Sequence, residues 1–417
     1  MSVRPEMGVF PVRLLQIANQ LDAEHELRRM GVDPGGIALM ASKMVHRCVH
    51  LSRLQCRQAN VLKQEMLSLG GDAAVARGTV ACSIEATDVI LMGTDKQLQL
   101  LCSKLAAQPF GLRPIATEIE HALARAERGP RSWQTSRREL SLARPLIMGI
   151  LNATPDSFSD SSHHFDPQQA LDRALEMVEQ GVDIIDIGGE STRPGAQPVS
   201  EELELQRVVP VIRLLAERVS CPLSVDTWKS AVAQGAMDAG AEIINDISGL
   251  TFDPRMAQVA SRTGAGVVLM HTRGTLETMH NTTTYRDLLG EVAQELSVSL
   301  ELALSAGIKP ERVVLDPGIG FSKNAEGNLE LLRRLRELSV LGPPLLVGTS
   351  RKSFIGKALG RDASQRVHGT AATVALAVAN GASILRVHDV AEMRDAADMA
   401  HAITTGLPGK PPPPASH

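Results

Sequence analysis

The sequence has 417 residues, of which 43% are hydrophobic, and its formal net charge is -4 at pH 7. This length suits one large barrel with a smaller domain, or two to three ordinary domains. Because the chain has no basic excess to neutralise phosphates, we expect no nucleic-acid partner. No stretch approaches the ~20 consecutive apolar residues that a membrane helix needs, so we expect no membrane partner.

Two features favour a cytoplasmic protein. The first twenty residues lack the apolar core of a secretion signal. The five cysteines include no CxxC pair, so neither a disulfide scaffold nor a zinc site is indicated. We therefore expect reduced thiols in the cytoplasm.

Residues 1–127 form the first region, which we expect to be a small α/β domain. The segment from Asp88 to Met92 has a strand pattern, and Thr94 or Asp95 is positioned to cap a following helix. A glycine pair, Gly70-Gly71, leaves a second small-molecule site open as a hypothesis. A role in packing or oligomer contacts is the simpler interpretation of this domain.

The rest of the chain alternates short apolar runs with longer amphipathic segments. Residues 128–144 are polar and basic and contain a Gly-Pro pair, so we predict a linker there. Eight runs rich in Val, Ile and Leu follow, at residues 146–151, 182–187, 222–226, 242–246, 266–271, 312–316, 344–348 and 383–387. Such runs are typical of parallel strands covered on both faces. The proline-rich residues 406–417 are expected to be disordered.

Eight strand-helix units over residues 145–405 predict a (β/α)8 TIM barrel, preceded by the smaller α/β domain. A doubly wound open sheet is the alternative. It would usually carry a glycine-rich dinucleotide turn after its first strand, and the segment from Asn152 to Pro155 is not one.

Polar side chains recur where the predicted strands end. These residues are Asn152, Asp226, Asn245, Asp246, His271, Asp316, Lys352, Arg386 and His388. Because the catalytic groups of a TIM barrel lie at this end, we expect them to share one rim. A single Asp or Asn could simply cap the next helix. The acids and the amide suit a flat heterocycle with N–H donors, whereas Arg386 and His388 suit a phosphate.

Seven segments resemble, in order, the signatures of the dihydropteroate synthase family. They are MGILNATPDSFSD (148–160), DIGGESTRPGA (186–196), SVDTWKS, IINDISG, LDPGIGFSKN, GTSRKSFIG and RVHDV. The resemblance implies a pterin-binding transferase of folate biosynthesis and a target of sulfonamides. Such an enzyme condenses (7,8-dihydropterin-6-yl)methyl diphosphate with 4-aminobenzoate to give 7,8-dihydropteroate and diphosphate. It also implies Mg²⁺ as cofactor and a homodimer.

The resemblance assigns roles to individual residues of this chain. The implied catalytic residues are Lys352, Arg386, His388 and Asp160. The implied substrate-binding residues are Thr192, Arg193, Pro194, Asp226, Asn245, Asp316, Phe321, Lys352, Ser353, Arg386 and His388. Asn152 would meet the diphosphate and its Mg²⁺. The implied reaction is dissociative: diphosphate leaves, a stabilised cation forms, and the arylamine attacks it.

Some positions depart from the commonest form of the family. Thr349 stands for a frequent Met, Ile319 for a frequent Phe and Ser322 for a frequent Gly, and MHTRG stands where MHMQG is usual. None of these changes removes a proposed polar group. His271 is most simply a structural residue.

Two alternatives remain at this stage. A methyltetrahydrofolate-dependent corrinoid methyltransferase shares the barrel, but it does not need the TPDSFSD and STRPGA loops. A non-catalytic pterin-binding paralogue should have lost Asn152, Lys352, Arg386 or His388, and all four are present.

Overall fold

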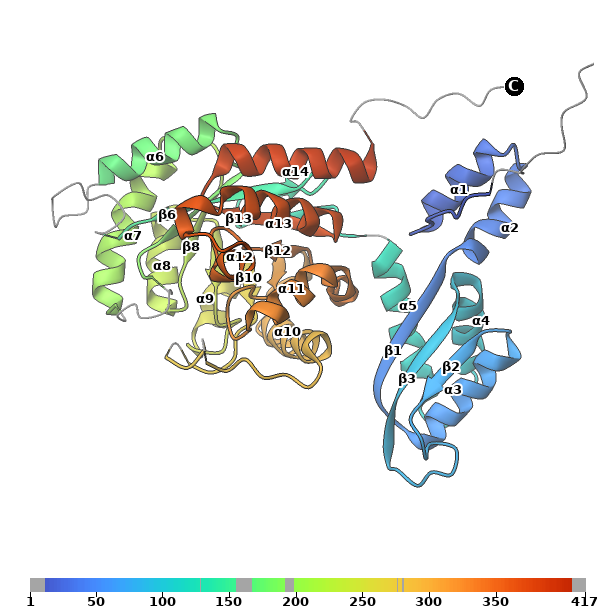
Figure 1. Ribbon diagram of the computed structural model, residues 1–417. Helices are drawn as coiled ribbons and strands as arrows, with labels where there is room; N and C mark the ends of the chain where they lie inside the picture. The colour runs from blue at the N-terminus through green and yellow to red at the C-terminus, as the bar shows by residue number, and fades with distance from the viewer. Residues whose placement is uncertain are drawn as a thin grey trace, which may run out of the picture. The chain divides into compact units, whose positions relative to one another are not determined.

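The structure is a computed structural model, and it describes residues 12–127, 129–154, 167–191, 199–275, 277–279 and 281–406. Its contacts divide the chain into two compact units, one within Met1–Arg128 and the other within Gly129–Lys410 (Figure 1). Within the described ranges, no helix combines the length and the apolar character that a membrane crossing requires. Each unit has its own core and is described separately.

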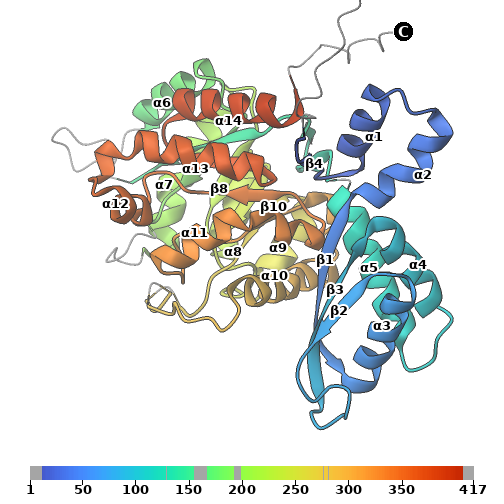
Figure 2. The same cartoon turned by 45° about the vertical axis from the view of Figure 1, so that its right-hand side comes forward.

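The N-terminal unit is an α/β domain built on a three-stranded antiparallel sheet. Its elements are α1 (Gln20–Arg29), α2 (Pro34–Met44), β1 (His46–Gln55), α3 (Cys56–Ser68), β2 (Asp72–Val75), β3 (Ala86–Thr94), α4 (Asp95–Leu105) and α5 (Leu112–Glu127). The strand order is β1-β3-β2. Helices α3, α4 and α5 share one apolar cluster with the sheet, and α1 and α2 form a separate small cluster (Figure 2).

The predicted strand and helix in this unit are confirmed. Thr94 is the N-cap of α4: its hydroxyl accepts from the backbone of Gln97, and the Gln97 side chain accepts from the backbone of Thr94. The glycine pair serves close packing. A Cβ on Gly71 would lie 2.1 Å from the Met66 side chain, which also covers Gly93. The space that a ligand would need at Gly71 is therefore filled by Met66.

The second unit is a closed barrel of eight parallel strands. They are β6 (Leu146–Asn152), β7 (Ile184–Gly188), β8 (Leu223–Asp226), β9 (Ile243–Asp246), β10 (Gly266–Met270), β11 (Val313–Asp316), β12 (Leu345–Val347) and β13 (Ala382–Val387). The helices between and after them are α6 (Pro167–Glu179), α7 (Glu201–Ala216), α8 (Ser230–Ala239), α9 (Met256–Thr263), α10 (Leu288–Ser305), α11 (Ala325–Arg333), α12 (Ser353–Leu359), α13 (Val367–Ala379) and α14 (Val390–Thr405). The predicted TIM barrel is confirmed, and every predicted strand is present.

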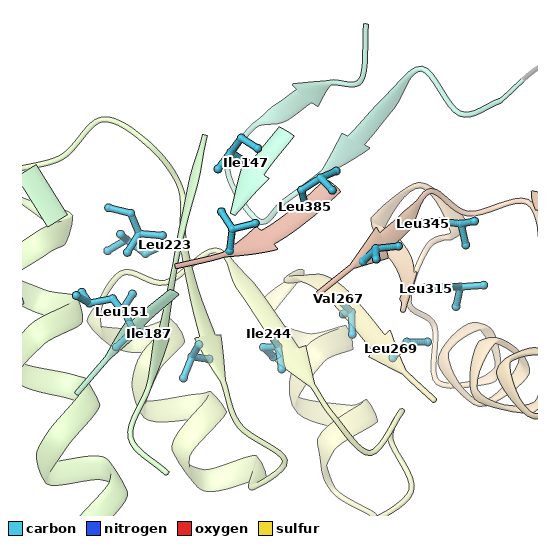
Figure 3. Close-up of a cluster of buried hydrophobic side chains, with 14 of the residues drawn as sticks. Ile147, Leu151, Ile187, Leu223, Ile244, Val267, Leu269, Leu315, Leu345 and Leu385 are labelled. Carbon is cyan, nitrogen blue, oxygen red and sulfur yellow. The ribbon is translucent and has the colours of Figure 1, made fainter. Parts of the chain in front are cut away.

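The barrel has two apolar layers because successive side chains of a strand point to opposite faces. Side chains such as Ile147, Leu269 and Leu385 point outward and pack between the strands and the helices (Figure 3). Side chains such as Met148 and Ile384 point inward and fill the barrel. These two layers explain why each strand reads as an almost continuous apolar run.

Part of the predicted linker belongs to the barrel unit. Strands β4 (Ser132–Gln134) and β5 (Glu139–Ser141) form an antiparallel hairpin. Trp133 of this hairpin is fully buried in the inward-facing cluster, and its Nε1 donates to the carbonyl of Arg312 at 2.9 Å. The linker prediction over 128–144 is therefore wrong for the hairpin. Burial of the large indole side chain fixes these residues to the barrel.

Candidate active site

A group of polar side chains lies next to the apolar interior of the barrel, on the side of the C-terminal strand ends. Inward-facing Ile184, Ile243, Val314 and Ile384 belong to the interior cluster. Because the side-chain period of a strand is two, the next inward positions are Asp186, Asn245, Asp316 and Arg386. The strand pattern thus places four polar side chains around one opening, the barrel mouth at the C-terminal strand ends.

Arg386 of β13 connects three strands across this mouth. Its Nε donates to Asp186 Oδ2 at 2.6 Å, and its terminal nitrogen donates to Asp226 Oδ2 at 2.6 Å. Asn245 Nδ2 donates to the same Asp186 oxygen at 3.1 Å. The pKa of Arg386 is raised because its two carboxylate partners outweigh the effect of burial. Asp186 therefore orients both Arg386 and Asn245.

The other two carboxylates of the mouth, Asp226 and Asp316, both have raised pKa values. Burial raises the pKa of Asp226 to about 7; Arg386 lowers it, and neighbouring Asp186 raises it further. Burial also raises the pKa of Asp316, although the ammonium of Lys352 opposes this shift. Three carboxylates thus face two cations, Arg386 and Lys352. When all are ionised, the mouth carries a negative excess that suits a cationic or N–H-rich ligand.

Lys352 precedes α12 and reaches into the mouth from the β12 side. Its ammonium donates to the carbonyl of Ile319 and lies 4.7 Å from the centre of the Phe321 ring. Burial lowers the pKa of Lys352 to about 8, while Asp316 raises it. A Cβ on Gly320, which has a φ of +84°, would lie 2.7 Å from the Lys352 side chain. A glycine at this position thus allows the lysine to lie along the loop.

Near Asp316, the buried side chain of Lys323 organises the loop that joins β11 to α11. Lys323 Nζ lies 2.8 Å from His271 Nδ1, and His271 Nε2 lies 2.9 Å from Glu295 Oε2. Burial lowers the pKa of Lys323 to about 7, and burial and the lysine together lower that of His271 to about 4. His271 therefore stays neutral near pH 7, in agreement with a structural role.

At the β6 side of the mouth, Asn152 and His388 line a cavity of about 430 Å³, whose other charged side chains are Asp172, Arg173, Glu176 and Arg351. Ser350 Oγ lies 2.9 Å from His388 Nδ1 and accepts from the His388 backbone at 3.1 Å. Arg351 pairs with Asp389. Arg173 is paired with Glu176 on α6, so the side chains of this cavity that suit an anionic group are Asn152, His388 and Arg351.

A buried cluster joins the two stems of the loop between β7 and α7. Lys229 Nζ donates to Glu190 at 3.1 Å, to Glu204 at 2.5 Å and to the carbonyl of Val199 at 2.7 Å. Glu190 also accepts from the backbone of Val199 at 2.8 Å. The positions of residues 190 and 199, on either side of the loop, are thereby tied together.

The structure places the predicted site residues in three groups. Asp226, Asn245, Asp316, Lys352 and Arg386 converge at the mouth, with Phe321 against Lys352. Asn152 and His388 line the adjoining cavity, and Ser353 is the exposed first residue of α12. The remaining predicted residues, Asp160, Thr192, Arg193 and Pro194, lie outside the described residues.

Two residues of the site had no assigned role in the sequence prediction. Asp186 lies inside an apolar run, but its inward direction follows from the alternation of Ile184, Asp186 and Gly188. Lys323 is buried although it follows a glycine-rich loop, and no local pattern indicates its burial. By contrast, Asp246 accepts from Ser248 and Leu250 and organises the turn that follows β9.

One departure from the family pattern has a local explanation. Ser322 has a φ of +52°, a left-handed conformation that favours glycine. Its hydroxyl accepts from the backbone N–H of Arg273 at 2.8 Å and donates to the Arg273 carbonyl at 2.9 Å. These hydrogen bonds offset the backbone strain at Ser322. The two departures at Ser322 and in the MHTRG segment are therefore in direct contact.

The site offers few ligands for a metal ion. Within the residues that the structure describes, no group of three or more His, Cys, Asp or Glu side chains could hold a metal. Asn152 supplies one amide oxygen to the cavity that it lines with His388. This donor set fits Mg²⁺, which usually keeps several waters and binds through substrate phosphates and one or two protein oxygens.

Comparison with known proteins gives consistent matches. The family model described as pterin binding enzyme matches residues 148–388. A dihydropteroate synthase of Synechocystis is 51% identical over 261 residues, covering 62% of this chain and 90% of the relative. A solved dihydropteroate synthase of Yersinia pestis, in complex with a sulfonamide drug, is 45% identical with a TM-score of 0.62 and covers 65% of this chain and 98% of that one.

A third relative extends the similarity into the N-terminal unit. A probable bifunctional folylpolyglutamate synthase/dihydropteroate synthase of Halobacterium salinarum is 43% identical over 389 residues. The match covers 92% of this chain but only 46% of that relative. The N-terminal unit is thus shared with a protein that also contains a further large region.

Proposed function

The chain belongs to the pterin binding enzyme family and is a dihydropteroate synthase. From this identity we propose the role of each side chain of the site in the reaction. The substrates are (7,8-dihydropterin-6-yl)methyl diphosphate and 4-aminobenzoate. The C–O bond between the pterin methylene and the diphosphate breaks, and the arylamine nitrogen bonds to the methylene and then loses a proton. One observation carries the proposal: Arg386 connects Asp186 and Asp226 in the mouth that Lys352 and Asp316 share.

The pterin ring is proposed to lie against the carboxylates of the mouth. Asp226 and Asp316 accept from its N–H groups, Asn245 adds an amide, and Lys352 donates to the ring carbonyl. The negative excess of the mouth stabilises positive charge on the pterin as the diphosphate departs. Arg386 covers the ring while Asp186 holds its guanidinium in place.

The diphosphate is proposed to lie on the cavity that Asn152 and His388 line. Arg386 and His388 donate to its oxygens and hold it as negative charge accumulates there. When Mg²⁺ is bound, it neutralises part of that charge, and Asn152 is the described residue that would hold it. Asp160, Thr192, Arg193, Pro194, Phe321 and Ser353 are proposed to complete the aminobenzoate side.

The test is direct. The purified chain is mixed with pterin diphosphate, Mg²⁺ and labelled 4-aminobenzoate, and labelled dihydropteroate and released diphosphate are measured. Asp316→Asn should lower kcat/KM for the pterin substrate about 100-fold or more. Asp246→Asn, at a buried carboxylate that organises the turn after β9, should lower stability but leave the KM for the pterin substrate within about twofold. A folded wild-type chain that forms no dihydropteroate contradicts the proposal.

We also propose that the enzyme is a homodimer through α13 and α14. Helix α13 is apolar on nearly all sides, and it leaves Leu376 60% exposed. On α14, Met399 and Ile403 are 62% and 72% exposed. Large apolar side chains at this exposure favour a subunit interface. Light scattering should give twice the mass of 44.7 kDa, and Leu376→Glu with Met399→Glu should give a monomer.

We propose the cytoplasm as its location. The described cysteines are all free thiols, which fits a reducing compartment. Fractionation of the source cells, with the enzyme detected by activity, tests this proposal. Activity confined to a membrane or an extracellular fraction contradicts it.

A further inference from the structure

Lys323 is a buried lysine behind the pterin site whose hydrogen bonds are all directed to protein groups. Its Nζ lies 2.8 Å from His271 Nδ1, 3.0 Å from the carbonyl oxygen of Phe321 and 3.2 Å from that of Gly318. An ammonium has three N–H donors and no acceptor. The three partners therefore account for all three protons of the charged form.

This arrangement fixes the protonation of His271. Because the ammonium donates to Nδ1, that nitrogen is an acceptor, and the ring proton lies on Nε2. Nε2 then donates to Glu295, which is also paired with Arg273. The chain of contacts runs from Arg273 through Glu295 and His271 to Lys323.

Lys323 binds the carbonyl groups of the 318–321 turn, and this turn also shapes the proposed pterin pocket. Gly318 N donates to Asp316 Oδ1 at 2.7 Å, so the turn orients this carboxylate. The carbonyl of Ile319 accepts from Lys352, and the Phe321 ring lies against the same ammonium. A single buried cation thus sits under the turn that sets the positions of Asp316 and Lys352.

We propose that Lys323 is a positioning residue of the synthase: its ammonium closes the 318–321 turn and thereby sets Asp316, Lys352 and Phe321 for the pterin substrate. Lys323 reaches no substrate atom itself in this role. The inference rests on the proposed function of Asp316 and Lys352 as pterin contacts. Misplacement of such groups by about 1 Å can cost on the order of 100-fold in rate.

The test uses the full-length chain and four variants. Lys323→Met removes the ammonium, Lys323→Arg keeps a cation of different shape, and Lys309→Met is the control at an exposed lysine. Asp316→Asn reports on the pterin contact itself. Affinity is measured with 6-hydroxymethylpterin by its fluorescence, alongside kcat and KM for both substrates and the circular dichroism spectrum.

Lys323→Met should weaken 6-hydroxymethylpterin binding and raise the KM for the pterin diphosphate roughly 10- to 100-fold. The KM for 4-aminobenzoate should change less, and Lys309→Met should match the wild type. A folded Lys323→Met whose pterin affinity stays within twofold of the wild type overturns the inference. If Asp316→Asn also leaves the affinity unchanged, the proposed pterin contacts fail as well, so the two failures are distinguishable.

A pH measurement decides the case if Lys323→Met does not fold. Lys323 faces Asp316, Lys352, Glu295, Arg273 and His271, and burial lowers its pKa to about 7. In the wild type, the fall of pterin affinity at alkaline pH should include the loss of the Lys323 proton. In Lys323→Arg, whose cation keeps its proton, the fall should involve one proton fewer than in the wild type. An unchanged proton number in Lys323→Arg overturns the inference.

Discussion

The replacement of Asp186 by Asn tests whether the orientation of Arg386 limits catalysis. Asp186 is fully buried, and its Oδ2 accepts from Arg386 at 2.6 Å and from Asn245 at 3.1 Å. Its Oδ1 has no hydrogen-bond partner among the described residues. An Asn side chain preserves the shape of the carboxylate but removes its charge, and its NH₂ group would take a position without an acceptor.

The magnitude follows from the two hydrogen bonds. A bond to a charged group contributes about 1.5–3 kcal/mol, against about 1 kcal/mol for a neutral one. Loss of the charge should therefore cost about 0.5–2 kcal/mol per bond, or about 1–4 kcal/mol over both bonds. If this cost raises the free energy of the transition state, kcat/KM for the pterin substrate decreases roughly 5- to 700-fold, since each 1.4 kcal/mol is about tenfold.

The assay is steady-state kinetics with both substrates, with thermal unfolding as the measure of stability. Asp183→Asn is the matched control, because Asp183 is a partly buried carboxylate that also accepts from arginine. It accepts from Arg394 at 2.9 Å and from the backbone of Ile147 at 2.8 Å, before β7 begins. The control should lose stability but keep its kcat and KM. Equal kinetics in Asp186→Asn and the wild type, or equal losses in both variants, would refute the reasoning.

Three further predictions follow from the structure. The pH profile of kcat/KM for the pterin substrate should be bell-shaped: activity falls at acid pH as Asp226 is protonated and at alkaline pH as Lys323 and Lys352 lose their protons, and Asp226→Asn should lose the acid limb. Trp133→Ala should destabilise the barrel by about 3–5 kcal/mol in thermal or denaturant unfolding while kcat stays within about twofold. A chain of residues 129–417 should keep measurable activity, because the pterin binding enzyme family model matches residues 148–388, within the barrel unit; a folded but fully inactive truncation would contradict this.

The strands of the barrel could be predicted because burial on both faces demands apolar side chains at nearly every position. The β4–β5 hairpin could not, because each of its strands has only three residues and the surrounding sequence is polar and basic. Trp133 attaches the hairpin to the barrel together with Thr135 and Arg138, whose side chains both donate to Glu242. These contacts are scattered along the segment and leave no periodic pattern, so a linker was the simpler interpretation of the sequence.

In the site, too, some residues could be predicted from the strand pattern and others could not. Residues that contact a ligand directly lie at strand ends, and the barrel topology alone brings Asp226, Asp316 and Arg386 together. Residues that act through others obey no such rule. Asp186 lies one inward step before the end of its strand, and Lys323 is buried only because the 318–321 turn folds over it. Such residues become recognisable only when the partners of each buried charge are known, since a buried lysine or aspartate requires compensating groups.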